Sequence, residues 1–192
     1  MSRLKKIGVY GGTFDPIHCA HLILAREALE KLGLDEIVFV PAAISPHKLT
    51  QTPVLASTRV EMLRAAIAGE AQFCLDELEL RRPPPSYTFD TMKEFRQRHP
   101  HDQFYYLIGS DNLPRLETWH RFAELREMTQ FVVLHRGVGE IPSEFPKIMR
   151  HIDISATEIR KRVASGRSIR YLVPPAVEEI IAHHQLYREP ST

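Results

Sequence analysis

Residues 7–21 read Ile-Gly-Val-Tyr-Gly-Gly-Thr-Phe-Asp-Pro-Ile-His-Cys-Ala-His and join a short apolar run to a helical pattern. The apolar run predicts a buried strand, and the periodic apolar residues after His21 predict a helix as far as Leu32. Gly11 and Gly12 indicate that the backbone either lies close to another group or makes a turn that a side chain would forbid. A strand, a glycine-containing loop and a helix in this order are typical of an α/β fold.

The alternation of strand and helix patterns continues along the chain. Segments rich in branched and aromatic residues predict strands at 4–10, 36–40, 73–80, 104–108, 131–134 and about 148–154. Helices are expected at 21–32, 58–68, 88–98, after Trp119, after Ser155 and from 174 to about 185. Capping-box spacing marks two helix starts, at Thr58 with Glu61 and at Ser155 with Glu158. We therefore predict one α/β domain over residues 1–192, a Rossmann-like doubly wound parallel sheet, with the helical part from about 155 packed on it.

Composition limits the kinds of partner. The chain has 192 residues, a length suited to one domain, and 43% hydrophobic with 26% charged residues is ordinary for a soluble globular protein. The formal net charge is only +1, so the protein has no strong positive electrostatic potential that would attract a long polyanion such as nucleic acid. Any phosphate must be bound by a local pocket, which favours small phosphorylated ligands.

The sequence also bears on location. The first apolar run breaks at Gly8 and Gly11, before it reaches the length of a signal core, and no stretch approaches the roughly 18 apolar residues of a membrane span. Cys19 and Cys74 are the only cysteines, so we expect two thiols rather than a disulfide framework. These features predict a cytoplasmic protein with no membrane partner, and they leave a homo-oligomer open.

Four segments that carry polar or glycine residues fall where predicted strands lead into helices. They are residues 11–21, 41–48 (Pro-Ala-Ala-Ile-Ser-Pro-His-Lys), 109–112 (Gly-Ser-Asp-Asn) and 154–160 (Ile-Ser-Ala-Thr-Glu-Ile-Arg). In parallel sheets, ligands bind at the carboxyl ends of the strands, where such loops gather. We therefore expect the four segments to form one site.

His18 and His21 are three residues apart at a predicted helix start, so both rings face one side. Together with backbone amides they provide donors suited to a phosphate or another oxyanion. The glycines do not match the dinucleotide fingerprint, and no Gly-Lys-Ser/Thr follows as in a P-loop. Zinc would need a third ligand and usually another spacing. Taken alone, the two histidines fit surface or capping residues better than a phosphate site.

Beyond these residues, the chain resembles a known superfamily. Residues 11–21 are similar to the segment of the nucleotidyltransferases that carries His-x-Gly-His, and residues 154–160 resemble their partner motif Ile-Ser-Ser-Thr-x-Ile-Arg. A narrower resemblance, over almost the whole chain, is to bacterial nicotinate-nucleotide adenylyltransferases. It is carried by Pro41-x-x-x-x-Pro-His-Lys48, Arg59-x-x-Met62, Pro85-Ser-Tyr-Thr-x-Asp-Thr91, Gly109-Ser-Asp111 and Trp119. The chain departs from the motif at Ala20, which replaces the glycine between the histidines.

The resemblance implies transfer of adenylate from ATP to nicotinate mononucleotide, with Mg²⁺ carried on the ATP phosphates and no dedicated metal site. The catalytic residues that it implies are His18, His21, Lys48 and Arg160. The implied ATP-binding residues are Gly11, Gly12, Thr13, Phe14, Gly109, Asp111, Ser155 and Thr157. Those implied for the pyridine nucleotide are Lys48, Thr88, Trp119, His120 and Arg136.

This chemistry needs little acid–base help. A phosphate monoester has a second pKa near ~6, so its dianion is already a nucleophile at neutral pH. The protein must hold two anions together and neutralise the charge that develops on the α-phosphate and the leaving pyrophosphate. The histidines would stabilise this charge by hydrogen bonding. Lys48 would place a mobile positive charge on the incoming phosphate, and Arg160 would bind the triphosphate with its planar guanidinium group.

Plainer alternatives stay open for individual residues. Lys48 could be a solvent-exposed loop lysine, and Arg160 could lie on a solvent-exposed helix face. Asp111 could be an ordinary turn residue, and Trp119 could belong to the hydrophobic core. Two other functions also fit the sequence. One is a sibling adenylyltransferase that uses pantetheine phosphate or nicotinamide mononucleotide, and the other is a nucleotide-binding sensor without turnover, for which Ala20 is the one hint.

Overall fold

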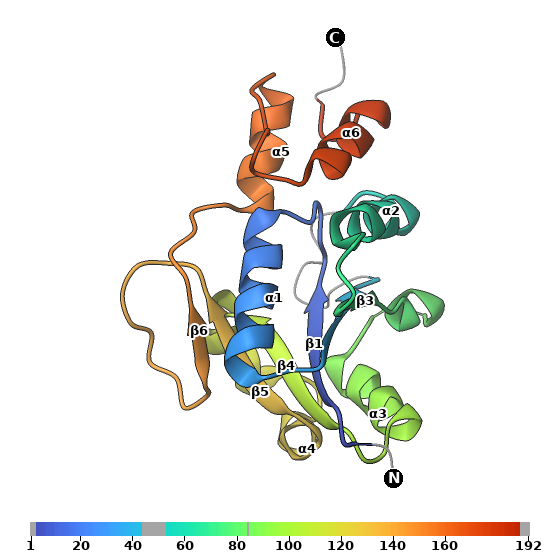
Figure 1. The fold of residues 1–192 in the computed structure, drawn as a ribbon, viewed down its shortest axis with the longest axis vertical. Coiled ribbons are helices and arrows are strands. Elements are labelled where there is room, and N and C mark those ends of the chain that lie inside the picture. The colour runs from blue at the N-terminus through green and yellow to red at the C-terminus, as the bar shows by residue number, and fades with distance from the viewer. Residues whose placement is uncertain (1–2, 44–52, 84, 189–192) are drawn as a thin grey trace.

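Six parallel strands form the central sheet in the order β3-β2-β1-β4-β5-β6 (Figure 1). The computed structural model describes residues 3–43, 53–83 and 85–188. The strands are β1 (Lys6–Gly12), β2 (Glu36–Pro41), β3 (Phe73–Leu75), β4 (Gln103–Gly109), β5 (Gln130–His135) and β6 (Lys147–Met149). This order reverses direction between β1 and β4, and such a switch point opens a crevice at the carboxyl ends of those strands.

Helices cover both faces of the sheet, as predicted for a doubly wound fold. The α-helices are α1 (Cys19–Leu32), α2 (Ala56–Ile67), α3 (Thr88–Arg98), α4 (Phe122–Met128), α5 (Ala156–Ala164) and α6 (Pro175–His183). Two 3-10 segments, η1 (Leu78–Arg81) and η2 (Ser110–Thr118), complete the elements of the described residues. One hydrophobic cluster joins the sheet to α1, α2, α5 and α6, and a second cluster joins it to η1, α3, η2 and α4.

The alternation of side chains along β1 explains the two clusters. Ile7 and Val9 point into the cluster with α3, whereas Tyr10 points into the cluster with α1. Burial of both faces is what a parallel sheet requires, and it accounts for the continuous apolar runs in the sequence. Figure 1 shows α5 and α6 together at the end of the molecule toward which β1 points, and α6 packs on α2.

Three local predictions were wrong. The strand expected over about 148–154 is only the short β6, which ends at Met149. The strand expected over 73–80 ends at Leu75, because the Asp76 carboxylate accepts the backbone N–H of Leu78 at 2.9 Å and turns the chain into η1. The expected cap at Thr58 is absent, since α2 begins at Ala56 and Thr58 is buried inside the helix. Here the helix start is set by packing rather than by a capping side chain.

The predicted cap of α5 and the two predicted thiols were confirmed. Ser155 caps α5, and its hydroxyl accepts the backbone N–H of Glu158 at 3.1 Å. Cys19 and Cys74 are both free thiols. In the ranges that the structure describes, no helix is both long and apolar enough to cross a membrane.

Candidate active site

Two adjoining cavities open at the switch point. The larger, of about 870 Å³, is here called the histidine pocket and is lined by Tyr10, Phe14, Asp15, His18, His21, Arg136, Ser155, Thr157, Arg160 and Tyr187. The smaller, of about 430 Å³, is called the tryptophan pocket and is lined by Glu79, Ser86, Tyr87, Thr88, Tyr106, Trp119 and His120. Both cavities are bordered by Gly11, Gly12, Thr13, Gly109, Asp111 and Asn112. Two ligands in these pockets would therefore meet along the end of β1.

The two glycines at the end of β1 make room for side chains. A Cβ on Gly11 would lie 2.2 Å from Tyr106 Oη, and one on Gly12 would lie 2.9 Å from the Phe14 ring. The unusual backbone turn lies instead at Phe14, whose φ is +48°. A similar contact explains Gly109, where a Cβ would lie 2.4 Å from the Asp111 carboxylate. The glycines thus allow close approach, one of the two roles that the sequence left open.

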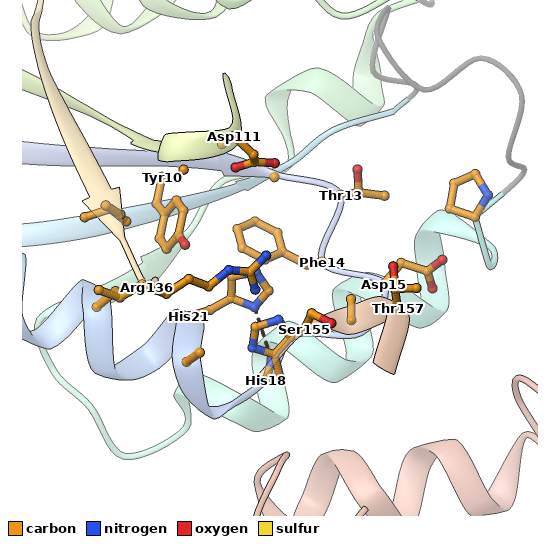
Figure 2. A pocket seen from close by; sticks show the side chains of 18 of the residues that line it. Tyr10, Thr13, Phe14, Asp15, His18, His21, Asp111, Arg136, Ser155 and Thr157 are labelled. Atoms are coloured by element: carbon orange, nitrogen blue, oxygen red, sulfur yellow. Dashed lines mark hydrogen bonds between the residues drawn. The ribbon is translucent and has the colours of Figure 1, made fainter. Parts of the chain in front are cut away.

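The histidines lie at the N-terminus of α1 and their rings stack, with centroids 3.6 Å apart. Figure 2 shows both rings in the pocket, with Arg136 facing the same space. The backbone N–H of His18 donates to Nδ1 of His21 at 3.2 Å. A neutral His21 must therefore carry its proton on Nε2.

His18 is uncharged at neutral pH. Its side chain is only 1% exposed, and this burial, reinforced by the charge of Arg136, lowers the pKa of His18 to about 3. The ring therefore acts as a neutral hydrogen-bonding group in the free protein. Positive charge in the histidine pocket comes from arginines.

Arg160, in α5, contacts the segment between β1 and α1 (residues 13–18), here called the histidine loop. Its Nη1 donates to the backbone carbonyl of Asp15 at 2.7 Å, and its Nη2 donates to Thr157 Oγ1 at 3.4 Å. Figure 2 shows Ser155 and Thr157 on the same side of the pocket as His18 and Asp15. Segments about 140 residues apart in the sequence therefore meet here, as the sequence predicted.

Arg136 lies in a different place from the other residues predicted for the pyridine nucleotide. It follows β5, lines the histidine pocket and donates from Nη1 to the carbonyl of Ile154 at 2.7 Å. Thr88, Trp119 and His120 all line the tryptophan pocket. The predicted set is thus divided between the two cavities. Lys48 lies outside the described residues.

The tryptophan pocket has an aromatic wall and a polar floor. Trp119 is half-buried and meets the ring of Tyr106 edge-on, with centroids 6.1 Å apart. Tyr106 Oη and Thr88 Oγ1 are hydrogen-bonded at 3.3 Å, and the His120 ring lies 4.6 Å from that of Tyr87. This combination suits a flat ring that carries a polar substituent.

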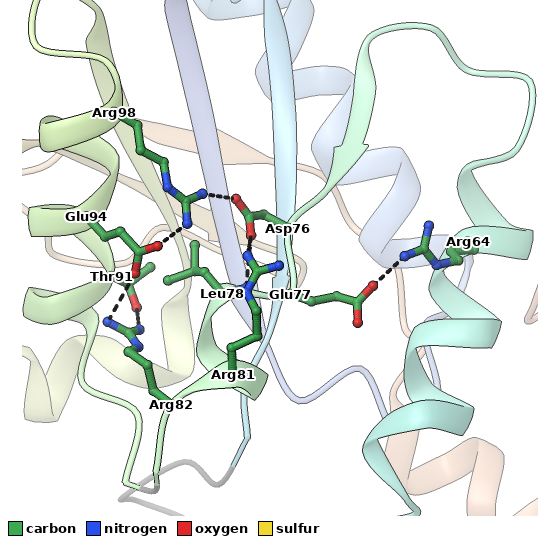
Figure 3. Close-up of polar contacts among 9 residues, drawn as sticks. All are labelled: Arg64, Asp76, Glu77, Leu78, Arg81, Arg82, Thr91, Glu94 and Arg98. Atoms are coloured by element: carbon green, nitrogen blue, oxygen red, sulfur yellow. Dashed lines mark hydrogen bonds and ion pairs between the residues drawn. The ribbon is translucent and has the colours of Figure 1, made fainter.

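Sequence reasoning missed the buried carboxyl group of Glu79 in that pocket. Thr91 Oγ1 donates to Glu79 Oε1 at 2.6 Å, and burial raises the pKa of Glu79. Figure 3 shows nearby ion pairs and hydrogen bonds that connect the residues on either side of η1 to α3. In particular, Arg82 donates to the same Thr91 hydroxyl at 2.7 Å, and Arg98 pairs with Asp76 at 2.6 Å. Contacts between α3 and the residues on either side of η1 therefore help to hold Glu79 in place.

Arg59 and Tyr187 are two further residues to which the sequence assigned no role. Arg59 is 1% exposed and donates from Nη1 to the carbonyl of Thr13 at 2.8 Å. Tyr187 donates to the Asp15 carboxylate at 2.6 Å. An arginine among the apolar residues of α2 is a weak signal of such a role, and nothing in the sequence around Tyr187 indicates one.

The structure also shows where Ala20 lies and whether side chains gather that could hold a metal ion. Ala20 is buried in α1 at the edge of the histidine pocket, so its extra methyl group contributes to the core. Among residues 3–43, 53–83 and 85–188, no three or more His, Cys, Asp or Glu side chains gather in a group that could hold a metal ion. Asp15 and Asp111 are the carboxylates that line the histidine pocket.

Comparisons with known proteins identify the family. Residues 9–162 match the family described as cytidylyltransferase-like. A probable nicotinate-nucleotide adenylyltransferase of Exiguobacterium sibiricum is 43% identical over 187 residues, which cover 95% of this chain and 98% of that protein. The nicotinate-nucleotide adenylyltransferase of Bacillus subtilis is 39% identical over 187 residues, with 96% and 99% covered.

A solved structure shares the fold. The nicotinic acid mononucleotide adenylyltransferase of Plasmodium falciparum, complexed with NaAD, aligns with a TM-score of 0.80 over 95% of this chain and 97% of that one. Its sequence identity is 24%, so this likeness concerns the fold.

Proposed function

We infer that this chain, which belongs to the cytidylyltransferase-like family and within it to the nicotinate-nucleotide adenylyltransferases, transfers adenylate from ATP to nicotinate mononucleotide. The products are deamido-NAD and pyrophosphate. The observation that carries the mechanism is the meeting of the histidine and tryptophan pockets along Gly11 to Thr13. ATP in the first pocket and the pyridine nucleotide in the second would bring their phosphates together at that border.

The reaction is a displacement at the α-phosphorus of ATP. A phosphate oxygen of nicotinate mononucleotide forms a bond to that phosphorus while the bond to the bridging oxygen breaks and pyrophosphate leaves. The attacking phosphate is a dianion near neutral pH, so the site needs no general base. Its task is to align the two phosphates and to stabilise the negative charge that develops between them.

We assign this task to the histidines and arginines of the histidine pocket. His21 donates from Nε2, because its Nδ1 is occupied by the backbone N–H of His18. His18 adds a neutral donor, and Arg160 adds a charged fork that Asp15 and Thr157 hold in place. Lys48 remains our candidate for the point charge on the incoming phosphate. Arg136 serves the phosphate end of the site, because it lies in the histidine pocket.

Nucleoside and base recognition follow from the remaining lining residues. Asp111, beside Gly109 at the end of β4, is suited to accept hydrogen bonds from ribose hydroxyls. Gly11 to Phe14, Ser155 and Thr157 surround the ATP phosphates, and the Ser155 cap leaves amides of the first α5 turn available to an anion. Trp119 stacks on the pyridine ring, with Thr88 and His120 at the ring substituent.

Magnesium would be carried on the ATP phosphates. Two separate carboxylates, Asp15 and Asp111, line the histidine pocket, which suits an ion held mainly by phosphate oxygens and water. When bound, the ion neutralises charge on the triphosphate and on the leaving pyrophosphate.

The C-terminal helical part belongs to the same functional unit. Ser155, Thr157, Arg160 and Tyr187 all line the histidine pocket. We therefore propose one nucleotidyltransferase domain over residues 1–192. A cytoplasmic location is proposed on the two free thiols, which suit a reducing compartment.

Pyrophosphate release with ATP, Mg²⁺ and a panel of acceptors tests the function. Nicotinate mononucleotide, nicotinamide mononucleotide and pantetheine phosphate are supplied one at a time. We expect turnover with nicotinate mononucleotide well above the other two. Turnover only with pantetheine phosphate would assign the chain to the sibling activity, and binding of ATP without turnover on any acceptor would favour the sensor.

A further inference from the structure

The loop that carries the histidines is tied down from three distant parts of the chain. Arg59 in α2 donates to the carbonyl of Thr13, and Arg160 in α5 donates to the carbonyl of Asp15. Tyr187, which follows α6, donates from its hydroxyl to Asp15 Oδ1 at 2.6 Å. His18 follows three residues later, so these bonds act on the backbone immediately before it.

Tyr187 is held in a defined orientation. Its ring is half-buried and packs against the cluster that contains α1 and α2, while its backbone adopts a left-handed φ of +61°. This conformation is uncommon for a residue with a side chain, so specific contacts must hold it. Burial, and then the hydrogen bond to Asp15, raise the pKa of Tyr187, which keeps the phenol protonated and able to donate.

The orientation of the Asp15 carboxylate matters because Asp15 lines the pocket to which we assign the ATP phosphates. A carboxylate free to turn toward the triphosphate would repel it. Arg59 and Arg160 lie close enough for their positive charges to lower the pKa of Tyr187, against the larger effect of burial. The Tyr187 hydroxyl donates a hydrogen bond to one carboxylate oxygen of Asp15. The bond to Tyr187 thus directs the carboxylate toward the C-terminal segment.

We propose that Tyr187 is a positioning residue for adenylate transfer, which acts through Asp15 to fix the loop that presents His18 and His21 to the phosphates. The proposal rests on the proposed function for its kinetic part. Its structural part, the restraint of residues 13–21 by the Tyr187 hydroxyl, can be measured without turnover.

The test uses Tyr187→Phe, which removes the hydroxyl and keeps the ring. Misplacement of catalytic groups by about 1 Å can cost ~10²-fold in rate, so we expect kcat to fall about 10- to 100-fold. The KM for nicotinate mononucleotide should stay within about twofold, because the tryptophan pocket does not include Tyr187.

His184→Ala, which removes the imidazole and cannot donate to Glu61, is the matched control. His184 Nε2 pairs with Glu61 Oε2 at 3.0 Å and ties the same C-terminal segment to α2 at a distance from the histidine loop. Loss of this tether should lower the melting temperature about as much as Tyr187→Phe and leave kcat unchanged. Equal losses of kcat in the two variants would show a merely structural role and overturn the proposal.

Two further measurements make the test independent of folding and of turnover. If the hydroxyl acts only through Asp15, adding Tyr187→Phe to Asp15→Ala should cause no further loss of kcat. Amide hydrogen exchange without substrates should be faster over residues 13–21 in Tyr187→Phe and unchanged there in His184→Ala. Unchanged exchange in both variants would refute the restraint. Wild-type protein that shows no turnover with nicotinate mononucleotide would contradict the proposed function alone.

Discussion

The rings of His18 and His21 stack with centroids 3.6 Å apart and planes 20° apart, at the first turn of α1. The backbone N–H of His18 donates to Nδ1 of His21, which orients the His21 ring before any substrate binds, and the His18 ring stacks on it. Preorganised donors are more effective than mobile ones because they need no rearrangement as charge develops in the transition state. This arrangement makes the two rings the first target for substitution.

His21→Ala and His18→Ala should each lower kcat by ~10²- to 10³-fold, the usual cost of one donor lost from a transition-state site. Pyrophosphate release measures the rate, and thermal melting reports the fold. His21→Asn is the control, because its amide oxygen can still accept the His18 N–H that Nδ1 accepts now. It should melt closer to wild type than His21→Ala while kcat stays low. A variant with near wild-type kcat would remove that ring from phosphate binding.

The buried His18 should also make the fold sensitive to acid. Its pKa is about 3 in the folded protein against 6.5 for an ordinary histidine, so between these values the unfolded chain binds more protons than the folded one. The free energy of unfolding therefore falls as the pH drops below 6.5, by about 2 kcal/mol from this residue at pH 5. Urea unfolding at pH 7 and pH 5 measures the loss.

His18→Asn isolates this contribution, because asparagine does not titrate. The variant should lose about 2 kcal/mol less than wild type between the two pH values. Glu79, whose pKa is raised, gives stability that is lost as pH rises, but it is present in both proteins and cancels in the comparison. An identical acid loss in the two proteins would show that His18 is protonated in the folded state.

Gly11→Ala tests the close contact at the end of β1. The new Cβ would lie 2.2 Å from Tyr106 Oη and 3.2 Å from Cζ, and Tyr106 is buried between neighbours. We expect a loss of about 1 to 3 kcal/mol in the free energy of unfolding, as is typical of overpacking. Adding Tyr106→Phe removes the clashing oxygen, so the double variant should recover most of that loss.

Gly33→Ala provides the comparison. Gly33 has a φ of +60° and nothing within 4 Å of its Cβ position, so its substitution strains the backbone without a clash. Tyr106→Phe should not rescue it. Rescue of both glycine variants, or of neither, would argue against a specific contact between Gly11 and Tyr106.

Local features of the sequence predicted a large part of this architecture. Strand and helix periods, together with loops at the strand ends, were enough to place His18, Asp111 and Ser155 at one edge of the sheet. The Ser155 cap was predictable because it depends on residues three apart. The failure at Thr58 came from the same rule, since tertiary packing let α2 start earlier without a side-chain cap.

Contacts between distant segments could not be predicted in this way. Tyr187 and Asp15 are 172 residues apart, and no periodicity relates them. Arg59 resembles any helix arginine until the fold buries it against the carbonyl of Thr13. Glu79 lies in a segment whose pattern predicted a strand, so its place in the tryptophan pocket depends on the turn that Asp76 induces.

The start of α3 bears on the choice between the acid and amide forms of the substrate. Tyr87 is the N-cap, and its carbonyl accepts the amides of Asp90 and Thr91 at 3.1 and 3.2 Å. The helix itself offers no carbonyl to the amides of Thr88 and Phe89. These donors and the positive end of the helix dipole favour a carboxylate, whereas a carboxamide must turn its NH₂ group away from them.

We therefore predict that nicotinate mononucleotide is favoured over nicotinamide mononucleotide by ~10- to 1000-fold in kcat/KM, or roughly 1.4 to 4 kcal/mol. Competition of the two acceptors in one reaction gives the ratio directly from the products. Glu79 opposes this preference once it ionises, because its carboxylate lies in the same pocket and would repel the nicotinate carboxylate. The ratio should accordingly fall as pH rises, and Glu79→Gln, which keeps an acceptor for Thr91, should remove that pH dependence. Equal use of both acceptors at every pH would leave the adenylyltransferase activity in place and rule out the helix start as the basis of selectivity.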